Sequence, residues 1–372
     1  MIPSSCYNLL LQSILVIIEI GFVHSSLGAC KSLSKPPYCG FIQQVSSSSI
    51  NSVIFPSTQQ KYRDTAIRLH NHADLNSIST LFENDRILAI EKPNGIAHHS
   101  ENDQLGIMAM LREQMKNESN QVTTGTSDRL YGVHRLDKVT SGILLFAKDE
   151  EMAGLLSKAF REKKIVKYYV ALSAKKAKKK KQGWVKGIMV PSRRGSWKLV
   201  EKMGGGADDN YAATRFFTAG LGNLNNSFSN GMNVNADEYI LSLPKTLMLF
   251  HPITGKTHQI RVAAKSVGLP ILGDERYENT AVNGAFNAHR TYLHASAIHL
   301  DMKDIGLPEE GVLTLVSKPS FADLWEIKNN ESDESESMCI NAEQGFDSIL
   351  LQLLNKHCSC APILEKWENM IS

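Results

Sequence analysis

The sequence predicts a mixed α+β domain in the middle of a 372-residue chain. Three observations lead to this prediction. Short apolar runs typical of strands alternate with stretches whose apolar residues recur every three or four positions, as on one face of a helix. The links between strands include both hairpin-length and helix-length segments. A hydrophobic content of 42% is enough for a globular core, and the length allows one large domain or two ordinary ones.

Six segments have the pattern of strands. In chain order they are 87–90, 143–147, 166–172, 212–217, 246–250 and 292–300. The second of them, ILLFA, is apolar throughout, so we expect it to be buried.

Two helices are predicted in the first half of the domain. The stretch 105–115 places four apolar residues roughly on one face: Leu105, Met108, Leu111 and Met115. The stretch 149–164 begins at Asp149, which can cap it, and continues with acidic residues in the first turn and lysines at the end.

A third helix is predicted over 257–267. Thr257 can cap its start, and Gly268 can end it. On this helix His258, Arg261 and Lys265 share one face.

Composition predicts the domain boundaries. Residues 1–60 are interpreted as a leader that is removed or disordered, and 61–327 as the folded domain. Within that domain 218–237, rich in Asn, Gly and Ser, is expected to be a flexible insertion. Residues 328–372 are expected to form a polar C-terminal tail.

The leader bears on location. Its apolar run is short and interrupted by Gln12 and Glu19, which argues against stable membrane insertion of the mature chain. Small residues follow, and the Ser-rich stretch from Ile20 to Arg63 has no acidic residue, as in organelle transit peptides. We therefore expect an organelle, a plastid in preference to a mitochondrion. A disordered leader on a cytoplasmic or nuclear protein is the alternative.

Charge is unevenly distributed, although the net charge is only +3. Between Arg161 and Lys202 the sole acidic residues are Glu162 and Glu201. A basic band with tryptophans among its lysines and arginines is suited to a polyanion whose bases can stack. Its candidate RNA-contact residues are Trp184, Lys186, Arg193 and Arg194. The lysine run 175–181 alone is better interpreted as a solvated loop.

The six cysteines all lie outside residues 40–338, so the middle of the chain carries neither a disulfide framework nor a cysteine metal site. The pair Cys358 and Cys360 lacks a second ligand pair for a metal. We predict no metal.

The segment YGVHRLDKVTSG, residues 131–142, places His134, Arg135 and Asp137 beside a buried strand. Desolvated charges need partners or a function. The segment does not fit the kinase catalytic loop, and ITGKT lacks the first glycine of a phosphate loop. A carboxylate that acts on a substrate needs a nearby cation, and a flipped base needs an aromatic surface.

The same segment resembles the signature of the RluA-type pseudouridine synthases, the group with His-Arg-Leu-Asp. Four further blocks follow the family in order: ILAIEKPNGIAHH, KYYVAL, HPITGKTHQIRVAAKSVGLPILGDERY and LHASAIHL. The resemblance covers most of residues 86–300. It implies one α+β domain with the pseudouridine synthase fold, a mainly antiparallel mixed central sheet flanked by helices, and an active site in a central cleft.

The resemblance also implies isomerisation of uridine to pseudouridine in ribosomal or transfer RNA, with no metal or cofactor. Asp137 matches the family's catalytic aspartate, and Tyr169 its active-site tyrosine. Arg261 matches the basic residue that pairs with the aspartate. Arg135 matches the arginine that holds RNA open around the flipped base. RNA is the expected partner, and a monomer is expected.

Three further residues are assigned more modest roles. His134 and His258 are counted among the RNA-binding residues but are expected mainly to orient loops through hydrogen bonds. Lys256, also a candidate RNA contact, stands where the family block usually has arginine. The chemistry at Asp137 stays open between addition to the ring, capture of the anomeric carbon, and removal of a sugar proton. The alternatives are a catalytically silent RNA-binding protein on the same fold and a basic component of an organellar ribosome.

Overall fold

The computed structural model describes residues 78–102, 104–119, 129–177, 181–201, 209–221, 244–278, 290–321 and 333–371. Every described residue belongs to one compact unit, Arg68–Ser372. The predicted leader, 1–60, lies outside the described residues, as does most of the predicted insertion 218–237.

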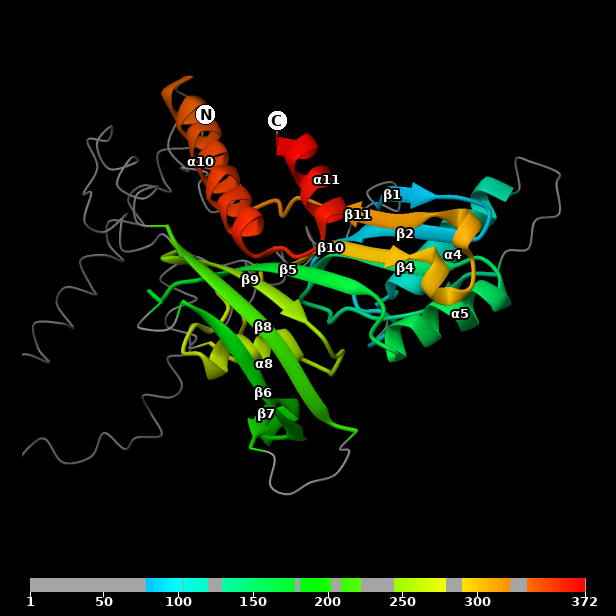
Figure 1. The fold of residues 1–372 in the computed structure, drawn as a ribbon, viewed down its shortest axis with the longest axis horizontal. Coiled ribbons are helices and arrows are strands. Elements are labelled where there is room, and N and C mark those ends of the chain that lie inside the picture. The colour runs from blue at the N-terminus through cyan, green and yellow to red at the C-terminus, as the bar shows by residue number, and fades with distance from the viewer. Residues whose placement is uncertain are drawn as a thin grey trace, which may run out of the picture. The chain divides into compact units, whose positions relative to one another are not determined.

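The described strands form one eleven-stranded sheet (Figure 1). Its strands are β1 (Ser79–Glu83), β2 (Ile87–Lys92), β3 (Tyr131–Gly132), β4 (Ser141–Ala147), β5 (Val166–Ser173), β6 (Gln182–Pro191), β7 (Trp197–Val200), β8 (Tyr211–Gly220), β9 (Thr246–Pro252), β10 (Leu293–Asp301) and β11 (Val312–Val316). The order is β1-β2-β4-β10-β5-β9-β8-β6-β7, with β3 paired to β4 and β11 to β10. Among the described pairings only β4 with β10 is parallel. The predicted α+β class with a mainly antiparallel mixed sheet is confirmed.

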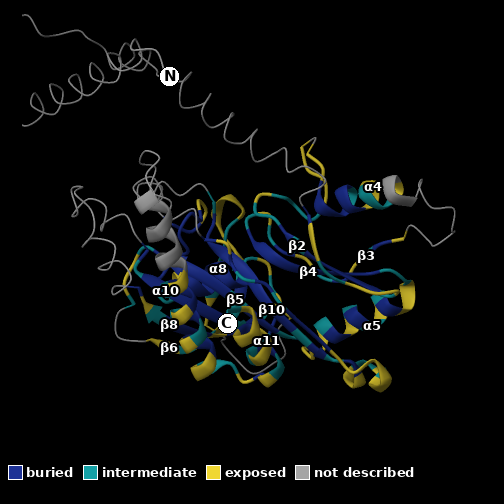
Figure 2. Cartoon of the chain, turned by 90° about the horizontal axis from the view of Figure 1, so that it is seen from above, coloured by how far each residue is buried: buried dark blue, intermediate teal, exposed yellow. Residues whose placement is uncertain are grey.

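Helices pack on both faces of this sheet. They are α4 (Ile107–Ser119), α5 (Glu150–Arg161), α8 (Gln259–Ser266), α10 (Asp333–His357) and α11 (Ala361–Ile371), and short 3-10 turns cover Arg193–Gly195, Met302–Ile305 and Pro308–Glu310. The alternation of side chains along β5 separates the two faces: Ala171 packs with α8, whereas Val170 and Leu172 pack with α10 and α11. The central strands β4, β5, β9 and β10 are accordingly buried, whereas the edge strands β1, β6 and β7 are partly exposed (Figure 2). None of the described helices is long and apolar enough to span a bilayer.

All six predicted strands are present, and so are the three predicted helices. The predicted cap of α5 is confirmed, because the backbone N–H of Met152 donates to Asp149 Oδ1 at 2.7 Å. The predicted insertion starts too early, since 218–220 form the end of β8. The sequence did not predict β1, β3, β6, β7 or β11.

The prediction of a polar tail over 328–372 differs from the structure. Within that range α10 and α11 bring five apolar side chains into the core beside β5 and β9: Phe346, Leu350, Leu354, Ile363 and Trp367. The first three recur every fourth residue, a helical spacing. The acidic stretch EIKNNESDESES that precedes them has the composition of a solvated segment, so composition alone predicts a tail here.

Candidate active site

A cavity of about 690 Å³ opens between the loop that precedes β4, the end of α5, strand β5 and the segment 252–261. It brings together Asp137, Tyr169 and Arg261, which the sequence analysis had placed in one site. The loop before β4 carries Asp137, β5 carries Tyr169 and α8 carries Arg261. Three segments far apart in the chain therefore meet at one carboxylate.

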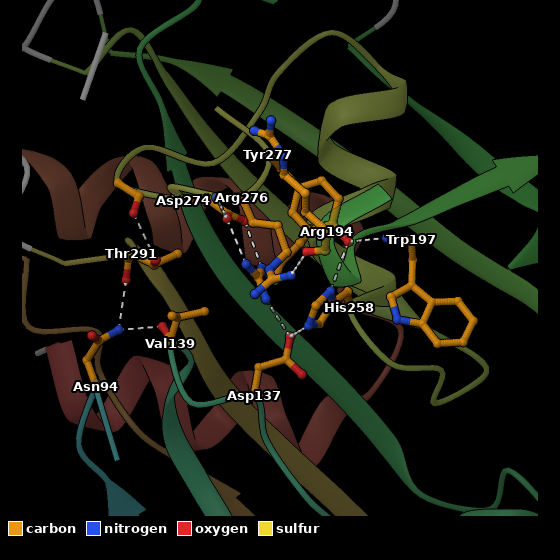
Figure 3. A network of polar contacts seen from close by, with 12 residues as sticks. Asn94, Asp137, Val139, Arg194, Trp197, His258, Asp274, Arg276, Tyr277 and Thr291 are labelled. Atoms are coloured by element: carbon orange, nitrogen blue, oxygen red, sulfur yellow. Dashed lines mark hydrogen bonds and ion pairs between the residues drawn. The ribbon is translucent and has the colours of Figure 1, made fainter. Parts of the chain in front are cut away.

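Two side chains, those of Lys92 and Asn94, bind the loop that carries Asp137 through hydrogen bonds to backbone carbonyl oxygens. Lys92 is completely buried, and its ammonium donates to the carbonyl oxygens of Pro93 at 2.7 Å, Ile96 at 2.8 Å and Lys138 at 3.3 Å. Asn94 donates through its side-chain amide to the carbonyl of Val139 (Figure 3). Burial lowers the pKa of Lys92 to about 7. The backbone just after Asp137 is thus fixed by one buried ammonium group and one half-buried amide.

Gly142 explains the Thr-Ser-Gly turn after the aspartate. Its φ is +105°, and a Cβ at this position would overlap the backbone of Ala295 on β10. This is where β4 pairs in parallel with β10, at Gly142 and Ala295. Only glycine permits both the backbone angle and the close approach.

Arg261 is 4% exposed and is bound by two carboxylates. Its Nε and Nη2 donate to the two oxygens of Asp274 at 2.8 and 2.7 Å, and its Nη1 donates to Asp137 Oδ2 at 3.3 Å. Burial is the largest single cause and acts to lower the pKa of Arg261, but the hydrogen bonds and negative charges of Asp274 and Asp137 together outweigh it and raise the pKa. The bidentate pair fixes the guanidinium, so that one N–H is directed at Asp137.

His258 lies on the other side of the Asp137 carboxylate, with its Nε2 4.0 Å from Asp137 Oδ2 (Figure 3). Its Nδ1 is hydrogen-bonded to the Tyr277 hydroxyl at 2.9 Å, and that hydroxyl also accepts from the backbone N–H of Trp197 at 2.8 Å. Burial lowers the pKa of His258, with Asp137 opposing the shift. The imidazole is therefore held in one orientation beside the carboxylate.

The start of α8 differs from the prediction that Thr257 caps it. The helix begins at Gln259, and His258 adopts the left-handed conformation with φ 58° and makes no side-chain capping bond. Instead the buried Gln259 side chain ties down the preceding turn. Its Oε1 accepts from Thr254 Oγ1 and from the backbone N–H of Lys256, and its Nε2 donates to Thr214 on β8. A non-glycine residue in this conformation is typical of functional sites.

Tyr169 lies on β5, opposite Phe250 of β9 and Ala295 of β10. Its side chain lines the cavity. Burial, and then the negative charge of Asp137, raise the pKa of Tyr169 well above its usual value. The phenol therefore stays neutral and offers an aromatic surface beside the carboxylate.

His134 and Arg135 precede the aspartate and lie differently. His134 Nε2 accepts from the backbone N–H of Leu145 at 2.9 Å, and its ring stacks on Phe160 with centroids 4.4 Å apart. Burial lowers the pKa of His134 to about 3, so it is neutral and anchors the loop to β4. Arg135 is exposed at the cavity.

The remaining predicted RNA-contact residues are spread over the surface. Lys256 lines the same cavity and donates to the carbonyl of Asp209. Trp184 and Lys186 line a separate cavity of about 730 Å³, and the Lys186 ammonium lies 4.6 Å from the centre of the Trp184 ring. The structure therefore does not bring these two residues to Asp137.

Arg193 and Arg194 form an exposed turn between β6 and β7. The Arg194 carbonyl accepts from Arg276 Nη1 at 2.6 Å. Through Arg276 this turn is attached to the segment that holds Asp274 and Tyr277 (Figure 3).

Four residues of the site have no role in the sequence interpretation: Lys92, Lys167, Asp274 and Tyr277. Asp274 and Tyr277 lie in the block GDERY, and a buried arginine needs a carboxylate, so that signal was available. Lys92 ends an apolar strand, an unusual place for a lysine. Among the described residues no group of three or more His, Cys, Asp or Glu side chains is arranged to hold a metal ion.

Comparison with known proteins gives consistent matches. A family model described as RNA pseudouridylate synthase matches residues 86–266. A protein of Haemophilus influenzae described as an uncharacterized RNA pseudouridine synthase is 37% identical over 249 residues, which are 67% of this chain and 90% of that protein.

Two more distant relatives act on different RNAs according to their names. The ribosomal large subunit pseudouridine synthase C of Rickettsia prowazekii is 31% identical over 61% of this chain and 64% of its own. The tRNA pseudouridine synthase C of Haemophilus ducreyi is 28% identical over 60% of this chain and 84% of its own. Among solved structures, human RNA pseudouridylate synthase domain containing 1 matches 73% of this chain and 97% of its own, with a TM-score of 0.49 and 17% identity.

Proposed function

The chain belongs to the RluA-type RNA pseudouridine synthases, and from this premise we propose that it isomerises a uridine of ribosomal or transfer RNA with Asp137 as the reacting carboxylate. The observation that carries the proposal is the position of that carboxylate. It faces a cavity of about 690 Å³ that also contains Tyr169, and it lies 3.3 Å from a guanidinium that Asp274 holds in place.

Ribosomal and transfer RNA are proposed because relatives named for each are similar to this chain over about three fifths of its length. The cavity entrance carries exposed Arg135, Arg161 and Lys163, which are suited to phosphates. The target uridine leaves its stack at a cost of a few kcal/mol and enters the cavity. There the neutral Tyr169 ring stacks on the uracil and offsets part of that cost.

Inside the cavity the bond between C1′ and N1 breaks, the uracil turns, and a bond forms between C1′ and C5. The hydrogen on C5 leaves as a proton, and N1 gains one, so the reaction is neutral in redox terms. Asp137 initiates it by adding to the ring, by capturing C1′ or by taking a sugar proton. Each route needs an ionised carboxylate after substrate has excluded water, and Arg261 stabilises that charge.

The test is release of tritium from RNA labelled at C5 of uridine, because forming pseudouridine expels that hydrogen. Ribosomal RNA and transfer RNA from cells that lack the gene are assayed separately with the full chain. We expect release from one pool with wild type and none above background with Asp137→Asn. Asparagine preserves the shape and removes the charge.

The pool that releases tritium identifies the substrate class. Equal release by wild type and Asp137→Asn would show that another group is the catalyst. No release from either pool, with RNA still bound, would support the catalytically silent binder.

A further inference from the structure

Lys167 is a buried lysine whose side chain belongs to the cavity wall. It lies on β5 two residues before Tyr169, so the two side chains share one face of the sheet, about 7 Å apart along the strand. Both line the cavity that contains Asp137. Lys167 is only 8% exposed.

The ammonium of Lys167 has no hydrogen-bond acceptor and no carboxylate partner among the described residues. It lies 5.7 Å from the centre of the Phe160 ring, and its positive charge also helps to lower the pKa of His134 and of His251. Burial lowers the pKa of Lys167 to about 8, with no neighbouring charge contributing. A buried cation without a counterion costs stability, so a well-packed apolar side chain would be the more stable choice for the fold alone.

The surroundings of Lys167 are basic. Arg161 and Lys163, at the end of α5, are exposed and line the same cavity. The acidic residues that line it are Asp137, which already contacts Arg261, and the exposed Asp209. Lys167 therefore lies in a basic part of the cavity and has no carboxylate partner among the described residues.

We propose that Lys167 binds a backbone phosphate of the substrate RNA next to the flipped uridine. The proposal rests on the proposed function, since it requires RNA in this cavity. The phosphate supplies the missing counterion in a place where water is scarce and an ion pair is strong. With the uracil stacked on Tyr169 and the adjoining phosphate on Lys167, one strand positions both ends of the nucleotide beside Asp137.

The experiment uses the full chain carrying Asp137→Asn, so that bound RNA is not converted. The probe is a fluorescein-labelled oligouridine of about 15 nucleotides, because its bases need no unpairing to enter the cavity. Binding is measured by fluorescence anisotropy over a salt series with and without Lys167→Met. Lys158→Met is the matched control: it makes the same change of charge on the exposed side of α5, where Lys158 lies near Glu162.

We expect Lys167→Met to weaken binding about 10-fold and to reduce the slope of log affinity against log salt by about 0.7, the value for one phosphate on a single strand. We expect Lys158→Met to change affinity less than about twofold. The melting temperature of Lys167→Met should equal or exceed that of its parent, because an unpaired buried charge is removed.

Three results would overturn the proposal. Equal affinity for Lys167→Met and Lys158→Met would remove Lys167 from the RNA interface. Weaker binding with an unchanged salt slope would assign the contact to the uncharged base. Weaker binding together with a lower melting temperature would mean that Lys167 supports the fold. Absence of binding by the parent protein would instead count against RNA in this cavity, and so against the proposed function.

Discussion

Arg261 and Lys167 are buried cations in the wall of the same cavity, and their surroundings differ completely. Arg261 is 4% exposed and donates to Asp274 and Asp137, whereas Lys167 is 8% exposed, lies beside the Phe160 ring and has no carboxylate partner among the described residues. The fold neutralises the first charge internally and leaves the second without a described counterion. We infer that Arg261 is held rigid to serve Asp137 and that Lys167 is left available for an anion from outside.

The strongest test of this difference removes the carboxylate that holds Arg261. Asp274→Asn keeps the size of a side chain that is 0% exposed but leaves the buried guanidinium without its bidentate partner. We expect the free energy of unfolding to fall by about 3–5 kcal/mol. Chemical denaturation followed by circular dichroism measures it.

Asp137→Asn is the matched control for that measurement, because it also removes a carboxylate that Arg261 contacts. Asp137 is 18% exposed and makes a single 3.3 Å bond, so we expect a loss below about 1 kcal/mol. Similar losses for the two variants would mean that the guanidinium does not depend on Asp274, and the comparison would fail.

Lys92 extends the comparison to a second buried lysine, one whose ammonium is satisfied. Lys92→Met leaves the carbonyls of Pro93, Ile96 and Lys138 without their donor, so we expect a loss of about 3 kcal/mol. Lys167→Met, with the same change of atoms, should lose nothing. Thermal unfolding of the two variants measures both effects. Equal falls in melting temperature would show that the hydrogen bonds of Lys92 do not make it more important to stability than Lys167.

The sequence predicted which residues meet at the cavity better than it predicted the residues that hold them in place. Asp137, Tyr169 and Arg261 each lie in a short sequence block that resembles the family's, so the resemblance alone predicts that the three side chains share one site. The ammonium of Lys92 donates to three backbone carbonyl oxygens. Every residue type has such an oxygen, so the sequence does not show which ones accept a hydrogen bond. Asp274 was within a quoted block, but its pairing with Arg261 depends on the turn after α8.

Elements at the edges of the sheet were harder to predict than those at its centre. The central strand β4 is buried at every position, which gives a continuous apolar run. Strand β6 alternates exposed and half-buried residues over most of its length and contains Gly183 and Gly187, so its pattern resembles a basic loop. Its pairing with β7 and β8 comes from tertiary context.

The stability of wild type and of Lys167→Met, measured over a pH series, tests whether the charge of Lys167 is uncompensated. Burial lowers the pKa of Lys167 to about 8 from about 10.5 in the unfolded chain, so between these values the unfolded state binds more protons and stability rises with pH. Below pH 8 the wild type has the full cost of a buried charge, and above about pH 10.5 it has none. We expect the stability advantage of Lys167→Met over wild type to shrink by about 3 kcal/mol across this window. Taking the difference between the two proteins cancels every other titrating group, Lys92 included. A constant difference would show that the charge of Lys167 is compensated in the folded protein.

The smallest expected effect concerns the support of His258. Tyr277→Phe keeps the ring, which lies 5.0 Å from the Arg261 guanidinium, and removes only the hydroxyl that bonds His258 and the N–H of Trp197. We expect a loss of about 1 kcal/mol in stability and a few-fold fall in the rate of tritium release, since the imidazole can then turn away from Asp137. A double-mutant cycle with His258→Ala separates the two contacts: if Tyr277 acts through His258, removing the hydroxyl has little further effect on rate once the imidazole is gone. Fully additive effects on rate would mean that Tyr277 acts on the site through its contacts with Trp197 or Arg261 and not through His258.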